Sequence, residues 1–255
     1  MTQLLFLGSG SAFTVGTDNY QSNILIIDEN NNKLLIDCGS DIRFSLYDAG
    51  LSYQDITDIY ISHLHADHVG GLEYIAFARK FTPNCTIPNL YLSKDIAQEL
   101  WENSLSAGLR SVQNNLMTID DYFNIQAISK NNNCFQWQNI QFELVKVIHI
   151  NNGFYIMPCY GLFFQINGVN IFFTSDTQLC LTQLQPYYEK ADIIFQDCEL
   201  NEYPTTVHAN FADLKHLPLS IKNKMWLYGY HSALLPDYQE HGFLGFVKRA
   251  QSFDF

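Results

Sequence analysis

Short apolar runs separated by polar turn residues open the chain and predict β-strands. Runs of strand length cover residues 4–7, 23–27, 33–37 and 56–62. A helix is expected over residues 41–49, because its apolar residues fall on one stripe and a glycine follows as a C-terminal stop. The first third of the chain is therefore strand-rich, with one helix before the fourth strand.

The rest of the chain mixes one-sided helices with further strands. Apolar residues recur at helical spacing from Val69 to Phe81 and from Ile96 to Leu105. Asn167-Gly168 is the residue pair favoured for a type I′ turn and predicts a hairpin. Strand-rich blocks interleaved with helices favour sheets whose outer faces are covered by helices. The hairpin strands are expected over residues 162–166 and 169–174, other strands over 90–93, 140–150, 192–197 and 225–230, a helix over 211–217, and turns at 30–32 and 131–133.

Length and composition favour a single domain over residues 1–255. A chain of 255 residues with 47% hydrophobic residues can bury one large core, and no linker-like tract divides it. The N-terminal segment lacks a basic region and is interrupted by Gly8-Ser9-Gly10, which favours a first strand over a signal peptide. No apolar run reaches membrane-spanning length, so no membrane partner is expected. The 6 cysteines form no C-x-x-C pair, which fits reduced thiols and a cytoplasmic location.

Charge narrows the choice of partner. The 14 basic and 26 acidic residues give a net charge of -12, which repels a polyanion and disfavours long nucleic acids as partners. Part of the acidic excess would be neutralised if carboxylates hold cations.

The segment His63-Leu64-His65-Ala66-Asp67-His68 carries the strongest chemical signal. On extended backbone the two-residue spacing of His63 and His65 points both imidazoles to one side, so they can share one metal ion. Asp67 and His68 follow where the chain turns into the next helix. Four ligand-type residues in six positions predict a metal site, and the alternative, a solvated polar loop, explains them poorly.

This segment matches in full the H-x-H-x-D-H signature of the metallo-β-lactamase superfamily, which the chain resembles over nearly its whole length. Asp37-Cys38-Gly39 is similar to the D-x-G turn that supports the metal loop in that family. Thr174-Ser175-Asp176-Thr177 is similar to the segment that supplies a bridging aspartate. The resemblance implies an α/β fold, the αββα sandwich, in which two mixed sheets are covered by helices.

The resemblance also implies two zinc ions per chain, with manganese and iron as alternatives. It implies that His149 joins the first two histidines of the signature on one ion, that Asp176 bridges, and that Asp67 and His68 hold the second ion. Gly229 stands where relatives place the last histidine. His231 follows two residues later, on the same face of an extended strand. The alternative to His231 as a ligand is an opened second metal site.

His208 resembles the extra histidine of the tRNase Z-like branch, and Asp197 fits its acidic partner. That pair suits protonation of a leaving oxygen. The predicted catalytic residues are therefore His208 and Asp197, together with Asp67. Only 26 residues separate His149 from Asp176, which leaves no room for the RNA-binding arm of true tRNase Z enzymes.

The chain therefore resembles compact cyclic-nucleotide phosphodiesterases, such as the phage anti-Pycsar enzymes. The resemblance implies a homodimer that hydrolyses 3′,5′-cyclic nucleotides to nucleoside monophosphates, with a metal-bridging hydroxide attacking phosphorus. An RNA 3′-processing nuclease and a non-catalytic nucleotide-sequestering protein remain as alternatives. Phe154, Tyr155 and Tyr160, which follow His149, are expected to offer a platform for the base.

Overall fold

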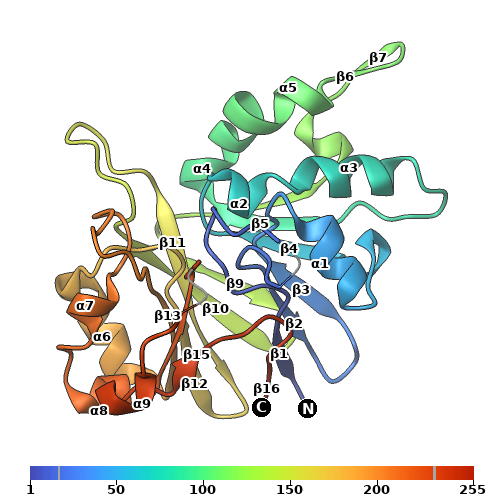
Figure 1. The fold of residues 1–255 in the computed structure, drawn as a ribbon. Coiled ribbons are helices and arrows are strands. Elements are labelled where there is room, and N and C mark those ends of the chain that lie inside the picture. Colours follow the sequence, from blue (N-terminus) through green and yellow to red (C-terminus); the bar gives the residue numbers. More distant parts are fainter. Residues whose placement is uncertain (17, 232–233) are drawn as a thin grey trace.

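Two seven-stranded sheets lie face to face in the structure (Figure 1). The computed structural model describes residues 1–16, 18–231 and 234–255. The first sheet has the strand order β16-β1-β2-β3-β4-β5-β8 and the second has the order β15-β14-β13-β12-β11-β10-β9. Each sheet is antiparallel on one side and parallel on the other. The strands of the first sheet are β1 Gln3–Phe6, β2 Ile24–Ile27, β3 Lys33–Ile36, β4 Asp58–Ile61, β5 Asn89–Ser93, β8 Asn124–Ile128 and β16 Ser252–Asp254.

The second sheet contains the predicted hairpin. Strands β11 and β12 pair around Asn167-Gly168, whose φ angles of 48° and 86° are those of the predicted turn. A separate two-stranded ribbon, β6 Ser111–Val112 with β7 Asn115–Leu116, projects beyond the helices (Figure 1). The strands of the second sheet are β9 Cys134–Trp137, β10 Ile140–Val147, β11 Cys159–Ile166, β12 Val169–Phe173, β13 Ile193–Asp197, β14 Met225–Tyr228 and β15 Gly245–Phe246.

Helices cover the outer face of each sheet. Alternation along β3 sends Leu34 and Ile36 into the core between the sheets, and Leu35 into the core beneath the first helical layer. On the second sheet Ile194 packs with Leu184 and Leu214 of the other helical layer. This confirms the predicted αββα sandwich. The helices are α1 Ile42–Asp48, α2 Ala66–Val69, α3 Leu72–Lys80, α4 Lys94–Glu99, α5 Ser106–Leu109, α6 Leu181–Lys190, α7 Phe211–Leu214, α8 Leu219–Lys222 and α9 Tyr238–His241, with short 3-10 turns at Tyr53–Asp55 and Ile119–Asp121 and a π-helical turn at Leu100–Leu105.

Several predicted elements differ from the structure in their bounds, and two of the differences occur at glycines. The helix expected from Val69 to Phe81 is divided between α2 and α3, because the Gly71 amide donates to the Cys38 carbonyl at 2.9 Å instead of continuing the helix. A Cβ on Gly71 would overlap the carbonyl of Gly39. The strand expected over residues 225–230 ends at Tyr228, because Gly229 has φ +82° and leaves the extended region. Among the described residues, each helix is too short or too polar to cross a bilayer.

The parallel strands position the site. Strands β3 and β4 are parallel neighbours in one sheet, and β12 and β13 are parallel neighbours in the other. The carboxyl ends of parallel strands meet at one edge, where the following turns are free to hold functional side chains. The turns after these four strands carry most of the predicted site.

Candidate functional site

Three histidines converge at this edge. His63 Nε2 and His149 Nε2 each lie 3.1 Å from His65 Nδ1. The Oδ2 atom of Asp176 lies 3.9 Å from His63 Nε2 and 3.7 Å from His149 Nε2. A tetrahedral zinc ion with bonds of about 2.0–2.1 Å brings its nitrogen ligands to within about 3.4 Å of one another, so this spacing fits one ion. The structure thus brings together the four residues predicted for the first metal.

A second group shares the same aspartate. His68 Nε2 lies 3.2 Å from Asp67 Oδ2 and 3.4 Å from Asp176 Oδ2. Within the described part of the chain, His68 Nε2 is a buried nitrogen with no hydrogen-bond partner. A buried nitrogen aimed at two carboxylates fits a cation between them, because an unpaired polar atom in this position would otherwise be costly. Asp176 belongs to both groups, as a bridging ligand would.

The turn after β3 holds these ligands from behind. The buried carboxylate of Asp37 accepts hydrogen bonds from the Ser62 amide and hydroxyl, each at 2.8 Å, and lies 2.7 Å from His68 Nδ1. Ser62 Oγ in turn lies 3.1 Å from His63 Nδ1. Gly39 is needed here because a Cβ would overlap the carbonyl of Asp67. Such outer contacts fix the ring orientation and tautomer of a metal-binding histidine.

Burial and the neighbouring charges shift the pKa values of these ligands in different directions: burial lowers the pKa of His68, but the charges of Asp176, Asp37 and Asp67 raise it well above its ordinary value. Burial lowers the pKa of His63 well below its ordinary value, so that imidazole is neutral and has a lone pair to offer. Burial raises the pKa of Asp176, but the charges of His68, His63 and His208 and the hydrogen bond with His68 together hold it well below its usual range. Neutral imidazoles and ionised carboxylates are the forms that bind divalent metals.

A third group lies beside the first two. His208 Nδ1 lies 2.7 Å from Asp197 Oδ2 and 4.0 Å from Asp176 Oδ2. Burial alone would lower the pKa of His208. The charge of Asp197 and the hydrogen bond to Asp197 outweigh burial and raise the pKa to about 10. Asp197 Oδ2 also accepts from the Thr177 amide at 2.9 Å, which fixes the carboxylate. His208 is therefore an imidazolium whose Nε2 proton is available for donation.

The last predicted ligand is not in these groups. The side chain of His231 is exposed and lines the same cavity as Asp67, but among the described residues the three groups of converging ligand atoms do not include it. A Cβ at Gly229 would lie 2.6 Å from Asp197 Oδ1. A ligand side chain at position 229 would therefore collide with the partner of His208. The role of His231 stays a prediction.

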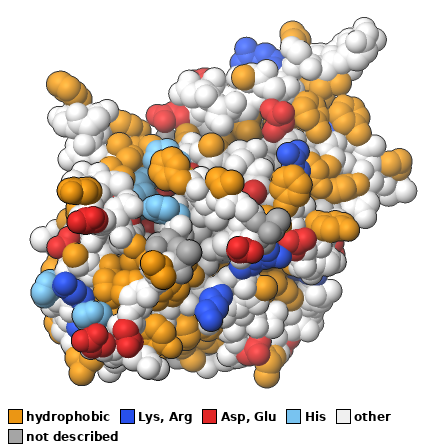
Figure 2. Space-filling view, in the orientation of Figure 1, with side chains coloured by type: hydrophobic (Ala, Val, Ile, Leu, Met, Phe, Trp, Pro, Cys, Tyr) orange, Lys and Arg blue, Asp and Glu red, His pale blue; other side chains and the backbone are white. Residues whose placement is uncertain are grey.

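The groups open into a cavity of about 270 Å³. Its wall includes Phe13, whose side chain is 80% exposed, while Phe154, at 100% exposure, Tyr155 and Tyr160 are not part of it. Figure 2 shows one group of histidine atoms left of the centre of the view, beside hydrophobic side chains, and another near its lower left edge. The aromatic residue against the site thus comes from the loop after β1, instead of the segment after His149 that the sequence favoured.

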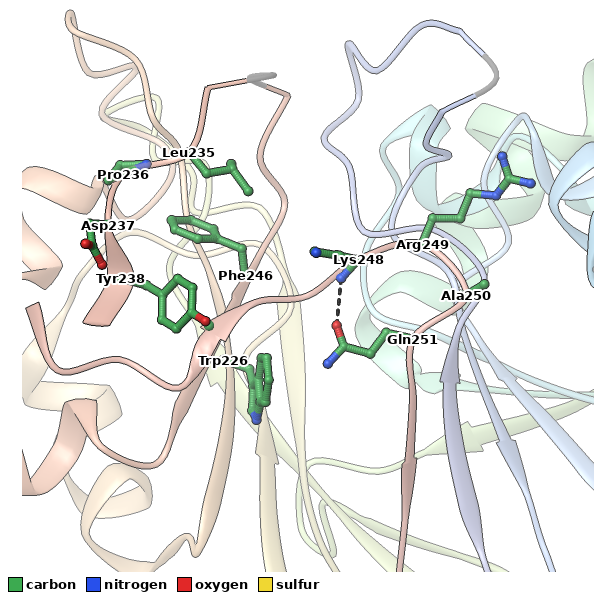
Figure 3. Close-up of a pocket in the computed structure, with 11 residues that line it drawn as sticks. Trp226, Leu235, Pro236, Asp237, Tyr238, Phe246, Lys248, Arg249, Ala250 and Gln251 are labelled. Atoms are coloured by element: carbon green, nitrogen blue, oxygen red, sulfur yellow. Dashed lines mark hydrogen bonds between the residues drawn. The ribbon is translucent and has the colours of Figure 1, made fainter. Parts of the chain in front are cut away.

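A larger groove lies elsewhere. It has a volume of about 760 Å³ and runs beside the crossing from β15 to β16, where Trp226, Tyr238 and Lys248 line it (Figure 3). None of the predicted ligands lines this groove. The converging histidines and carboxylates, and not cavity size, therefore identify the candidate site.

Comparison with known proteins agrees with this geometry. The family model described as Anti-Pycsar protein Apyc1 matches residues 2–253. The chain belongs to the Anti-Pycsar Apyc1 family. An Apyc1 protein of Paenibacillus harenae is 34% identical over 225 residues, 88% of both chains, and one of Bacillus phage vB_BveM-Goe7 is 31% identical over 239 residues, 90% of this chain and 89% of its own. The solved structure of YhfI from Bacillus subtilis, titled a metallo-beta-lactamase fold protein, superimposes with a TM-score of 0.75 at 16% identity and covers 99% of this chain and 98% of its own.

Together the fold and the site indicate the broad activity of this Apyc1-family chain. The metallo-β-lactamase fold is shared, and its strand ends carry histidine and aspartate groups spaced for divalent metal. These are the features expected of a metal-dependent hydrolase.

Proposed function

We propose that the protein is a dinuclear zinc phosphodiesterase that hydrolyses 3′,5′-cyclic nucleotides to nucleoside monophosphates. The observation that carries the proposal is the His208–Asp197 pair, which lies beside two groups of metal-ligating atoms that share Asp176. The proposed ligands are His63, His65, His149, Asp67, His68, Asp176 and His231.

The metals and the protein would divide the chemistry. Two zinc ions, when bound, would polarise the phosphoryl oxygens and lower the pKa of a water between them. The protein itself orients the ligands through Asp37 and supplies a proton through His208. In the opened 3′,5′-phosphodiester the departing sugar oxygen is a strongly basic alkoxide, so a positioned acid is worth about 10²–10⁴ in rate.

The size and charge of the site favour a small substrate. The cavity of about 270 Å³ is slightly smaller than the range of about 300–1,000 Å³ usual for ligand pockets, which favours a substrate no larger than a single nucleotide. The net charge of -12 disfavours a polynucleotide. Phe13 in the cavity wall offers a face on which any base can stack. The names of the curated relatives, which describe them as anti-Pycsar proteins, agree with a nucleotide substrate.

Assembly and location belong to the same proposal. Hydrophobic side chains such as Phe154 and Tyr203 are strongly exposed, and a second copy of the chain would cover such groups. All six cysteines are free, which agrees with a reducing cytoplasm. Sedimentation analysis at several concentrations tests the homodimer: a single species with the mass of one chain would contradict it.

The decisive experiment measures turnover. Purified protein is incubated with a panel of cyclic mononucleotides and dinucleotides, with and without a chelator, and the products are identified. We expect conversion of cyclic mononucleotides to monophosphates, loss of activity with chelator, and loss in His65→Ala. Failure of every cyclic mononucleotide to react would refute the proposal.

One observation favours a second candidate. Gly229 removes the usual last ligand, and a protein with one metal could bind a nucleotide without turnover. Metal analysis separates the two: two zinc ions per chain with turnover support the enzyme, and one metal ion with tight binding but no turnover supports sequestration.

A further inference from the structure

Glu199 closes the loop that carries His208. It lies two residues beyond the end of β13, where its amide donates to the Ala209 carbonyl at 2.9 Å and its carbonyl accepts from the Phe211 amide at 3.0 Å. The chain, having left β13 at Asp197, therefore pairs at Glu199 with the segment that returns at Asn210. Residues 200–208 form a loop whose two ends are joined by these hydrogen bonds, and we call it the His208 loop.

The side chain of Glu199 binds the inside of that loop. Its carboxylate is buried and accepts from the Thr205 amide at 2.9 Å and the Thr205 hydroxyl at 2.6 Å. Asn201 Nδ2 lies 3.2 Å away and Asn210 Nδ2 lies 3.3 Å away, both as further donors. Hydrogen bonds to an ionised carboxylate are about twice as strong as neutral ones. One residue therefore ties the beginning, middle and return of the loop together.

The His208 loop makes two contacts with the candidate site. It presents His208 to Asp197 at 2.7 Å, and the Val207 carbonyl lies 2.8 Å from His149 Nδ1. A carbonyl can only accept, so His149 Nδ1 carries the proton and its Nε2 keeps the lone pair that faces the other histidines. A shift of the loop would displace both groups. Misplacement of a reacting group by 1 Å can cost about 10²-fold in rate.

We propose that Glu199 is a positioning residue that holds the His208 loop so that His208 faces the departing oxygen of the substrate. Glu199 acts through the loop and is not assigned any contact with the reacting atoms. The inference rests on the proposed function, since it takes His208 as the acid.

Two phosphodiesters with different leaving groups test this role. The departing sugar oxygen of cyclic AMP needs a proton, whereas the nitrophenolate of bis(p-nitrophenyl) phosphate leaves without one. In zinc-loaded full-length protein, Glu199→Ala should lower kcat for cyclic AMP by about 10²-fold and change kcat for the nitrophenyl diester by less than about threefold. The zinc content should stay at the wild-type value. Glu199→Gln, which keeps the shape and one acceptor oxygen, should recover part of the lost rate.

Matched variants separate loop positioning from general damage. Thr205→Val removes the shortest bond to Glu199 and should show the same selective loss, whereas Thr205→Ser keeps the hydroxyl and should not. This pair also serves if Glu199→Ala folds poorly. Asp28 holds the β2–β3 turn in a similar way, through the amides of Asn30 and Asn32, at the opposite end of β3. Asp28→Ala should change neither reaction.

The outcomes distinguish failure of this inference from failure of the proposed function. If His208→Ala slows both diesters equally, the acid role of His208 in the proposed function is wrong. If His208→Ala is selective while Glu199→Ala and Thr205→Val are not, the positioning role is wrong. Equal loss on both diesters or loss of zinc in the Glu199 and Thr205→Val variants would also overturn it.

Discussion

The tautomer of His68 depends on one buried carboxylate, and Asp37→Asn tests that dependence. Asp37 accepts from the Ser62 amide and hydroxyl and lies 2.7 Å from His68 Nδ1. A carboxylate can only accept, so His68 Nδ1 donates, and Nε2 is the nitrogen that can bind metal once it has released its own proton. Asp37 has φ +62°, a conformation that asparagine also tolerates, so the substitution changes the hydrogen bonding with little backbone strain.

The magnitude follows from that geometry. In Asp37→Asn the side-chain oxygen of the asparagine can still accept from the backbone amide of Ser62. The side-chain nitrogen of the asparagine then lies against His68 Nδ1. His68 Nδ1 then has to accept, its proton moves to Nε2, and the lone pair facing Asp67 and Asp176 is lost. Loss of such an outer partner typically costs about 10–100-fold in metal affinity, or about 1.4–2.7 kcal/mol.

Competition with a chelator of known zinc affinity measures this effect. The wild-type protein should bind two zinc ions, and Asp37→Asn should release the one held by His68 at a chelator concentration about 10–100-fold lower. Asp58→Asn is the control, because Asp58 is also largely buried but lies at the other end of β4, where it accepts from Thr57 and Asn89. Unchanged affinity for both ions in Asp37→Asn would refute the reasoning.

Three further predictions follow from the site. The charge of Asp197 raises the pKa of His208 to about 10, so turnover of a cyclic nucleotide should fall above that pH. Asp197→Asn should move the fall to lower pH, because the carboxylate charge that raises the pKa is gone. An unmoved pH profile would contradict this. Phe13→Ala should raise KM for cyclic nucleotides about fivefold or more through lost stacking, with Phe154→Ala as the control, and equal effects of both would exclude the Phe13 platform. Gly229→Ala should lower Tm by about 2–8 °C, because an alanine at φ +82° costs about 1–2 kcal/mol and its Cβ would meet the Asp197 carboxylate. An unaltered Tm in thermal unfolding would show that the backbone relaxes there.

The hydrophobic pattern predicted the strands and helices that are determined by their own residues. Strands β2, β3 and β12 bury one or both faces over consecutive residues, so their apolar runs are visible in the sequence. Strand β16 has three residues, with Ser252 and Asp254 exposed, and exists because β1 pairs with it from the other end of the chain. The helix expected from Ile96 to Leu105 is interrupted by a π-helical turn, which the spacing of its apolar residues does not reveal. The single domain over residues 1–255 stays a prediction.

The candidate ligands were predictable for a similar reason. His63, His65, Asp67 and His68 are adjacent in the sequence, and their spacing alone indicates a metal site. Glu199 and Phe13 have no such signal, because each reaches the site through the path of a loop: one by closing the His208 loop, the other by the way the loop after β1 folds over the cavity. Glu199 could have been suspected from the spacing of Asp197 and His208, since an 11-residue separation requires a loop that something must hold.

The glycine at position 229 and the acid pair explain each other. Asp197 Oδ1 has no hydrogen-bond partner in the described part of the chain, and it faces Gly229, whose missing Cβ leaves space for it. A histidine at position 229 would require Asp197 to move, and with it His208, which depends on Asp197 for both its position and its charge. On this backbone, where Gly229 has φ +82°, a ligand side chain at position 229 would displace the acid pair, so the prediction of a further ligand for the second ion moves to a residue beyond the turn. His231, which lines the same cavity, is the residue in that position.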